Sequence, residues 1–207
     1  NESCLDAQMR RQIYGDIYDD SMWLIDLVEN LLSVTRIEEG RMQIRQSAEL
    51  VDEVIKEALK HTGQSRTGRT IKVEEEDELI LAKMDARLIV QVLINLIGNA
   101  VKYTPQGTDI TVRVKKEKAE NAERSQVIIS VCDLGNGIPD DRKERVFDMF
   151  YTGSDQVADS RRSLGLGLGL CRSIINAHGG KIWISDNIPH GAVVTFTLPA
   201  EEVALNE

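Results

Sequence analysis

The spacing of apolar residues in the N-terminal part of the chain predicts one long helix. Between residues 5 and 35 the sequence holds no proline and one glycine, Gly15. Apolar residues follow one another at steps of four, four, seven, four and three, which aligns them on one face of a helix. This stripe consists of Met9, Ile13, Ile17, Leu24, Val28 and Leu31. A lone helix cannot bury such a stripe, so we expect a partner helix, from upstream in a longer chain or from a second copy. The alternative is a core helix of the domain that follows.

Beyond Gly40, which favours the end of a helix, short strand-like runs alternate with helices. Strands are expected at residues 42–46, 71–73, 80–84, 110–115, 127–132, 181–185 and 192–198. Helices are expected at 50–59, from a cap at Asp85 to about Lys102, and at 165–177. Helices separate some strands, whereas short hairpins join others. This order indicates an α+β fold, a two-layer sandwich of one mixed β-sheet and helices preceded by the long helix, more than a doubly wound parallel sheet. We therefore predict two parts, residues 1–41 and residues 42–207.

Composition narrows the classes of function. The chain has 207 residues, of which 42% are hydrophobic and 29% charged, which is typical of a globular protein. Its formal net charge of −9 argues against a nucleic-acid backbone as the main partner. No apolar run approaches the roughly 20 residues of a membrane span. The sequence begins at Asn1 without a Met or a signal peptide, so we expect a piece of a longer protein. Cys4, Cys132 and Cys171 fit no metal or disulfide pattern and predict reduced, buried thiols.

A glycine-rich segment precedes the last expected helix, and it reads Gly165-Leu166-Gly167-Leu168-Gly169-Leu170. Glycine lets backbone N–H groups approach a phosphate, and a helix start favours negative charge. No strand comes directly before the segment, as a dinucleotide fingerprint requires, and no Gly-Lys-Ser/Thr follows, as a P-loop requires. Alone, the segment is equally compatible with a glycine-rich hinge.

A second glycine cluster follows the apolar strand expected at 127–132 and reads Asp133-Leu134-Gly135-Asn136-Gly137-Ile138-Pro139. This places Asp133 at a strand end, where the chain turns on two glycines. A carboxylate there accepts a hydrogen bond from the amino group of a flat heterocycle that lies on the glycines. A simple Asp-Gly turn is the alternative.

Polar side chains also mark one face of the helix that begins after Asp85. Asn95, Asn99 and Lys102 are spaced by four and three, and the rest of the helix is apolar. Two amides and an ammonium are costly on the inward side of such a helix unless they meet a ligand or ion. An amide oxygen coordinates Mg²⁺, and a lysine pairs with phosphate. The alternative is that both asparagines bond to the backbone inside the fold.

Together these motifs resemble the N, G1, F and G2 boxes of bacterial sensor histidine kinases, and they occur in that order. The boxes are Asn95-x-x-x-Asn99-x-x-Lys102, Asp133-x-Gly135-x-Gly137, Phe147-Asp148-Met149-Phe150 and Gly165-x-Gly167-x-Gly169-Leu170. The resemblance covers about residues 20–200. The long helix is similar to the second helix of the dimerisation and histidine-phosphotransfer hairpin. Its sequence is most similar to sensor kinases of the Kdp potassium type.

The resemblance implies a role for each box. Asn99 would ligate the Mg²⁺ that bridges the ATP phosphates, with Asn95 beside it, Lys102 near the phosphates and Tyr103 along the nucleotide. Asp133 would bind the adenine amino group. The remaining ATP-binding residues would be Gly135, Gly137 and Ile138 around the ring, Phe150, and Gly165, Gly167, Gly169 and Leu170 around the phosphates. Residues 151–163 would form a lid over ATP, packed at its base by Phe147 and Phe150.

Two departures from the family pattern stand out. Many relatives carry an arginine where this sequence has Thr152, so Arg161 or Arg162 is the candidate for that charge. The acceptor histidine of the family is followed by an acidic residue, which none of this chain's histidines is. We expect surface or capping roles for His61, His178 and His190. The acceptor is expected upstream of residue 1, so the chain alone is not expected to phosphorylate itself.

The resemblance implies a protein-histidine kinase that moves the γ-phosphate of ATP to an upstream histidine, for relay to a response regulator. ATP and Mg²⁺ are the implied cofactors, and the implied partners are a receiver domain and a second copy of the kinase. The implied location is the cytoplasmic portion of a membrane-anchored potassium sensor. One alternative is a hydrolytic ATPase of the same fold, although those relatives carry a glutamate base where this chain has Asn95. The other is a nucleotide-sensing interaction module.

Overall fold

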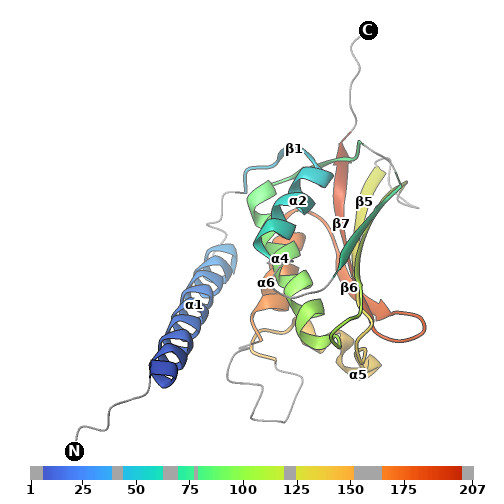
Figure 1. Ribbon diagram of the computed structural model, residues 1–207. Helices are drawn as coiled ribbons and strands as arrows, with labels where there is room; N and C mark the ends of the chain where they lie inside the picture. Colours follow the sequence, from blue (N-terminus) through green and yellow to red (C-terminus); the bar gives the residue numbers. More distant parts are fainter. Residues whose placement is uncertain are drawn as a thin grey trace, which may run out of the picture.

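The computed structural model describes residues 7–38, 44–62, 70–76, 79–118, 125–151 and 165–201 (Figure 1). Its helices are α1 (Ala7–Glu38), α2 (Val51–His61), α4 (Ala86–Tyr103), α5 (Asp140–Lys143), the 3₁₀ turn η1 (Arg145–Phe147) and α6 (Gly167–Ala177). Its strands are β1 (Ser47–Leu50), β2 (Ile71–Glu75), β3 (Leu81–Met84), β4 (Ile110–Lys118), β5 (Ser125–Cys132), β6 (Ile182–Asp186) and β7 (Ala192–Glu201).

The strands form one mixed sheet with the order β1-β3-β7-β5-β4-β2, and β6 also pairs with β7. β2 and β4 run parallel, whereas the other pairs are antiparallel. β2 and β3 follow one another in the sequence yet lie on opposite sides of the β7–β5–β4 centre. β6 pairs with the start of β7 and β3 with its end, so the long β7 supports the whole sheet.

Three amphipathic helices cover one face of this sheet. Figure 1 shows α2, α4 and α6 side by side in a layer against the strands, which confirms the predicted two-layer α+β sandwich. α4 is the central helix, and its apolar side is almost completely buried. Burying one Leu or Ile side chain contributes about 1.5–3 kcal/mol, so this helix is a rigid base for the polar residues that it carries.

Asp85 caps α4 as predicted, because its Oδ1 accepts a hydrogen bond from the Leu88 N–H at 3.4 Å. The strand expected at 42–46 is wrong for its described residues: 44–46 have no regular structure, and β1 begins at Ser47, where antiparallel pairing with β3 sets its position. Residues 42 and 43 lie outside the described residues. α5 and η1 were not predicted, since elements this short have no hydrophobic period. Residues 39–43, where the two predicted parts meet, lie outside the described residues, so that division stays a prediction.

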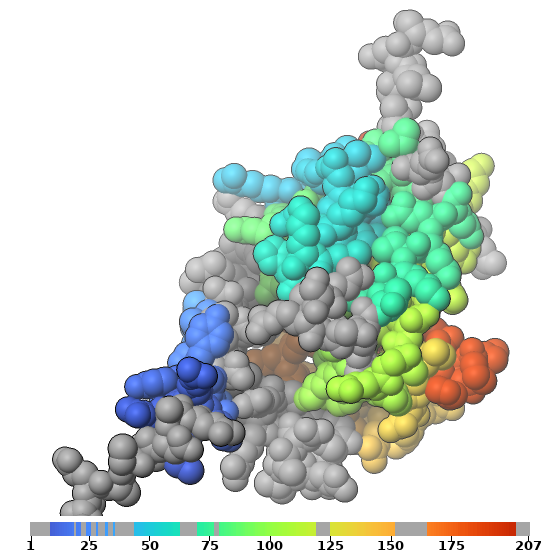
Figure 2. All heavy atoms as spheres, viewed as in Figure 1, coloured from blue at the N-terminus to red at the C-terminus, as the bar shows by residue number. Residues whose placement is uncertain are grey.

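The apolar stripe of α1 is not buried by this chain. Its described members, Met9, Ile13, Ile17, Leu24 and Val28, are between 39% and 56% exposed. α1 contacts the rest of the molecule at α6 and projects from its side, as the blue helix in Figure 2 shows. The interpretation of α1 as a core helix is therefore wrong for these residues, and the need for a partner helix stands. In the described part of the chain, no helix is both long and apolar enough to span a bilayer.

Candidate ATP-binding site

The polar face of α4 contains a buried amide without a partner. Asn95 and Asn99 are half-buried, one helical turn apart, and Lys102 is exposed one turn further on. The Nδ2 atom of Asn95 is buried and has no hydrogen-bond partner among the described residues. Buried amides of this kind are normally satisfied by protein, water or a ligand. The face therefore has an unused donor where the resemblance places ATP.

Cys171 on α6 adjoins this amide without forming a well-aligned hydrogen bond to it. Burial raises the pKa of the Cys171 thiol to about 12, and the Asn95 side chain offsets part of that rise. The thiol accordingly stays neutral at physiological pH, which leaves the Asn95 amide without a charged acceptor. Cys132 is likewise buried and free, so both described cysteines are buried thiols as predicted. Cys4 lies outside the described residues.

The start of α6 lies against Asn95. A Cβ atom placed on Gly167, the first residue of α6, would be 3.7 Å from the Oδ1 atom of Asn95. The unpaired N–H groups and the positive end of the helix dipole are found at this terminus. The glycine-rich segment and the asparagine face thus form one site, where backbone donors and a side-chain amide meet.

Asp133 occupies the end of β5, and one of its two carboxylate oxygens is unused. Its backbone N–H continues the sheet by donating to the Ala192 carbonyl at 2.9 Å. Oδ1 accepts hydrogen bonds from the N–H groups of Gly135, at 2.8 Å, and Ala192, at 3.3 Å. Within the described ranges, Oδ2 accepts no hydrogen bond. The half-buried carboxylate is therefore fixed through one oxygen and offers the other as an acceptor.

The loop after Asp133 packs on the end of α4. Gly135 is buried, and a Cβ atom there would lie 2.7 Å from the Tyr103 carbonyl oxygen, which is closer than a side chain tolerates. Glycine at this position lets the loop approach the helix. Gly137 and Ile138 are half-buried, and Ile138 packs against the small cluster of Phe147, Ile184 and Ala192. The glycine loop and the α4 face are consequently held together.

Lys102 and Tyr103 complete this side of the site at the end of α4. The Lys102 ammonium lies 5.0 Å from the centre of the Tyr103 ring, and both side chains are exposed. No carboxylate of the described residues pairs with Lys102, so its charge is available to an anionic ligand.

The two ends of the expected lid meet at one point. The Phe150 N–H donates to the Gly165 carbonyl at 3.0 Å, on either side of residues 152–164, which are not described. Phe147 is buried as expected, with Gly169 packed against its carbonyl. Phe150 is 61% exposed, and the lid residues that it would pack against lie outside the described residues, so its place at the lid base stays a prediction. Thr152, Arg161 and Arg162 fall outside the described residues.

Leu170 lies in the hydrophobic core and is fully buried. Its N–H donates to the Leu166 carbonyl at 2.9 Å, so in this structure Leu170 anchors the start of α6.

Sequence reasoning missed Arg172, whose guanidinium pairs with the Asp148 carboxylate at 3.2 Å and lies 5.6 Å from the centre of the Phe147 ring. This pair fastens the Phe147–Phe150 segment to α6. In the sequence, an arginine that follows a glycine motif does not by itself indicate such a contact.

The histidines occupy surface or capping positions, as predicted. His178 is buried at the end of α6, where Nδ1 donates to the Ile174 carbonyl at 2.8 Å and Nε2 accepts from the Asp85 N–H at 3.0 Å. Both ring nitrogens are therefore used. His61 is exposed beside Glu57, and His190 is exposed with Nδ1 3.2 Å from the Gly135 carbonyl.

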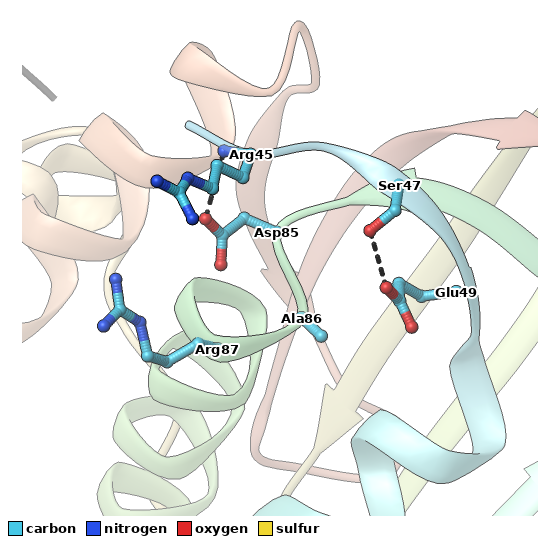
Figure 3. Close-up of a pocket in the computed structure, with 6 residues that line it drawn as sticks. All are labelled: Arg45, Ser47, Glu49, Asp85, Ala86 and Arg87. Atoms are coloured by element: carbon cyan, nitrogen blue, oxygen red, sulfur yellow. Dashed lines mark hydrogen bonds between the residues drawn. The ribbon is translucent and has the colours of Figure 1, made fainter. Parts of the chain in front are cut away.

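A recess of about 600 Å³ lies at the opposite end of α4 and is lined by Arg45, Ser47, Glu49, Asp85, Ala86 and Arg87 (Figure 3). Asp85 uses both oxygens there, one for Leu88 and the other for the Arg45 N–H at 3.2 Å. α4 is roughly 27 Å long, so this recess is distinct from the Asn99–Lys102 end of the helix. None of the motif residues lines it.

Comparison with known proteins identifies the family of this chain. Residues 84–202 match the sequence family described as histidine kinase-, DNA gyrase B- and HSP90-like ATPase. The sensor protein KdpD of Clostridium acetobutylicum is 39% identical over 97% of this chain, which spans 22% of that relative's length. The solved catalytic domain of histidine kinase ThkA is 31% identical, with a TM-score of 0.59 over 75% of this chain and 95% of its own. ThkA in complex with the response regulator protein TrrA matches 97% of this chain and 53% of its own at 24% identity and a TM-score of 0.66.

The matched range contains all four motifs and the site that they form, and the Kdp-type resemblance of the sequence is consistent with the KdpD relative. The chain belongs to the histidine kinase-, DNA gyrase B- and HSP90-like ATPase family and carries the ATP-binding catalytic domain of a sensor histidine kinase.

Proposed function

We propose that this domain binds ATP with Mg²⁺ and donates the γ-phosphate to a histidine of the parent kinase upstream of this chain, other than His61, His178 and His190. The observation that carries the proposal is the unpartnered Asn95 amide beside Gly167, at the meeting point of the α4 polar face and the start of α6. Backbone donors at a helix start, an amide and the Lys102 ammonium together suit a polyphosphate.

The same face suits a magnesium ion. Asn99 is half-buried one turn beyond Asn95 and offers an amide oxygen, which is a hard ligand of the kind that Mg²⁺ binds in nucleotide sites. A bound Mg²⁺ supplies neutralisation of phosphate charge as the transfer proceeds. Asn99 would hold the metal, whereas Lys102 would pair with phosphate oxygens directly.

Asp133 would orient the other end of the nucleotide. Its free Oδ2 accepts the hydrogen bond of an exocyclic amino group, which adenine has at the position where guanine has a carbonyl. An oxygen facing an oxygen is unfavourable, so this carboxylate selects ATP over GTP. The base and the phosphates are thereby fixed from opposite ends of one site, and positioning is the main task in phosphoryl transfer.

Transfer is favoured over hydrolysis because the α4 face has no general base. The helix from Ala86 to Tyr103 contains no Asp or Glu, and the amide of Asn95 does not take a proton from water. A hydrolytic ATPase remains the second candidate, since the family includes the gyrase B and HSP90 types.

The partners proposed are a response regulator and a second copy of the kinase. The ThkA complex contains a response regulator, and the exposed stripe of α1 suits a partner helix. By likeness to KdpD, we propose that the parent protein is a membrane-anchored potassium sensor with this domain on the cytoplasmic side.

A nucleotide titration with and without Mg²⁺ tests the site. Asn99→Ala is expected to weaken the binding of ATP in Mg²⁺ more than the binding of ADP in EDTA, because it removes a metal ligand. Asn176→Ala, at an exposed position on α6, is the matched control and is expected to change neither. Equal losses for both nucleotides in Asn99→Ala would mean that Asn99 is structural.

A further inference from the structure

The turn between β6 and β7 is hydrogen-bonded to the loop that carries Asp133. Asn187, directly after β6, donates from Nδ2 to the Asp133 carbonyl at 2.8 Å. Its Oδ1 accepts from the Ile188 N–H at 3.0 Å, and its own N–H donates to the Gly191 carbonyl at 3.0 Å. Asn187 is half-buried with each of its polar groups in use, except for its backbone carbonyl. Such a residue fixes both the turn and its neighbour.

Gly191 closes the same contact from the other end of the turn. Its φ is +114°, and a Cβ atom there would lie 2.0 Å from the Asp133 carbonyl oxygen. Only glycine leaves room for that carbonyl. The Asp133 carbonyl is consequently enclosed between the Gly191 backbone and the Asn187 amide.

A third contact comes from His190, whose Nδ1 lies 3.2 Å from the Gly135 carbonyl. The turn thus holds the backbone on both sides of the Asp133–Gly135 step. The side chain of Asp133 is held through Oδ1, which accepts from the N–H groups of Gly135 and Ala192. With the backbone and Oδ1 both fixed, the direction of Oδ2 is fixed as well.

We propose that Asn187 and His190 are positioning residues that aim Oδ2 of Asp133 at the nucleotide base, so that base selectivity depends on the β6–β7 turn. The inference rests on the proposed role of Asp133 in binding adenine. Neither residue touches the base in this scheme. Each acts through a main-chain carbonyl of the base-binding loop.

Asn187→Asp tests the positioning inference, because it replaces only the side-chain NH₂ group by an oxygen. The new carboxylate keeps the acceptor for the Ile188 N–H but loses the donor to the Asp133 carbonyl. We expect ATP binding, measured by calorimetry, to weaken about three- to tenfold, which is the worth of one hydrogen bond. GTP binding is expected to stay unchanged, so the ATP/GTP affinity ratio falls by the same factor. A residue that merely supported the fold would lower both affinities together.

Two further variants keep the test decisive. Ile188→Ala is the matched control, because this side chain on the same turn is 89% exposed and is expected to leave the ratio unchanged. His190→Ala removes the contact with the Gly135 carbonyl at an exposed position, so it serves if Asn187→Asp fails to fold, and it is expected to lower the ratio too. Parallel thermal unfolding shows which variants are intact.

The role of Asp133 is tested alongside. If Asp133→Asn abolishes the ATP preference while folded Asn187→Asp and His190→Ala keep it, the positioning inference is overturned and the base-binding role survives. If Asp133→Asn keeps the preference, Asp133 does not select the base, and both the base assignment and the inference are overturned. A lowered ratio in all three variants, with Ile188→Ala unchanged, supports the inference.

Discussion

Replacing Asp133 by asparagine separates the stability of the base-binding loop from its ligand selectivity. The asparagine side chain has the same shape, and its Oδ1 can still accept from Gly135 and Ala192. Charge-assisted hydrogen bonds are about twice as strong as neutral ones, so losing the charge costs about 1 kcal/mol of folding stability. The variant is therefore expected to fold, with a melting temperature a few degrees lower.

The effect on ATP binding is expected to be larger. The free Oδ2 of Asp133 becomes an NH₂ group, which cannot accept a hydrogen bond from the adenine amine. A hydrogen bond to a charged acceptor contributes about 1.5–3 kcal/mol, so the dissociation constant of ATP should rise roughly 10- to 150-fold. GTP binding should be unchanged or improved, because the new NH₂ group can donate to the guanine carbonyl.

Calorimetric titrations of both nucleotides at fixed Mg²⁺, with thermal unfolding of each variant, measure these quantities. Asp141→Asn on α5 is the control, since it removes the same charge at an exposed position outside the site. An intact Asp133→Asn protein that loses ATP and GTP affinity by the same factor, or that loses neither, would refute the assignment of Asp133 to the base.

Two more outcomes follow from the burial pattern. The thiol pKa of Cys171 is raised to about 12 by burial, so above pH 9 the folded state binds more protons than the unfolded state. Cys171 should then lower the free energy of unfolding by up to about 1.4 kcal/mol per pH unit between about pH 9 and 12, and Cys171→Ala should show a shallower slope than the parent chain in urea titrations at several pH values. Val28→Lys on α1 should leave ATP affinity and the unfolding midpoint of the sandwich domain unchanged, because Val28 is exposed. Loss of ATP binding in calorimetry of that variant would show that α1 supports the nucleotide site.

The parts of the fold that the sequence predicts well are those with local signals. Asp85 is a strong helix cap, and the apolar run that follows it predicts one amphipathic helix. The same helix presents Asn95, Asn99 and Lys102 on one face because of its period alone. The strand expected at 42–46 failed for the opposite reason, because pairing with β3, distant in sequence, decides where β1 lies.

The candidate site likewise has residues that local signals predict and residues that depend on contacts distant in sequence. The glycine loops stand out in the sequence because their residue type is rare in regular elements. Asn187 and His190 sit in a turn whose composition is typical of any turn, so their contacts with the Asp133 loop appear only once β5 and β7 are paired. The exposure of Phe150 likewise depends on how its segment packs on α6, which periodicity does not report.

The most direct test of phosphate donation uses ATP labelled in the γ-phosphate. The chain is incubated with a separate hairpin fragment that bears an acceptor histidine, and both acid-labile label and free phosphate are followed over time. We expect label on the fragment alone, weak because two separate pieces must meet, and lost in Asn99→Ala. Free phosphate released at the same rate with or without the fragment, with no label on it, would contradict the account in favour of a hydrolytic ATPase. Label on His61, His178 or His190 would contradict the assignment of the acceptor to another segment.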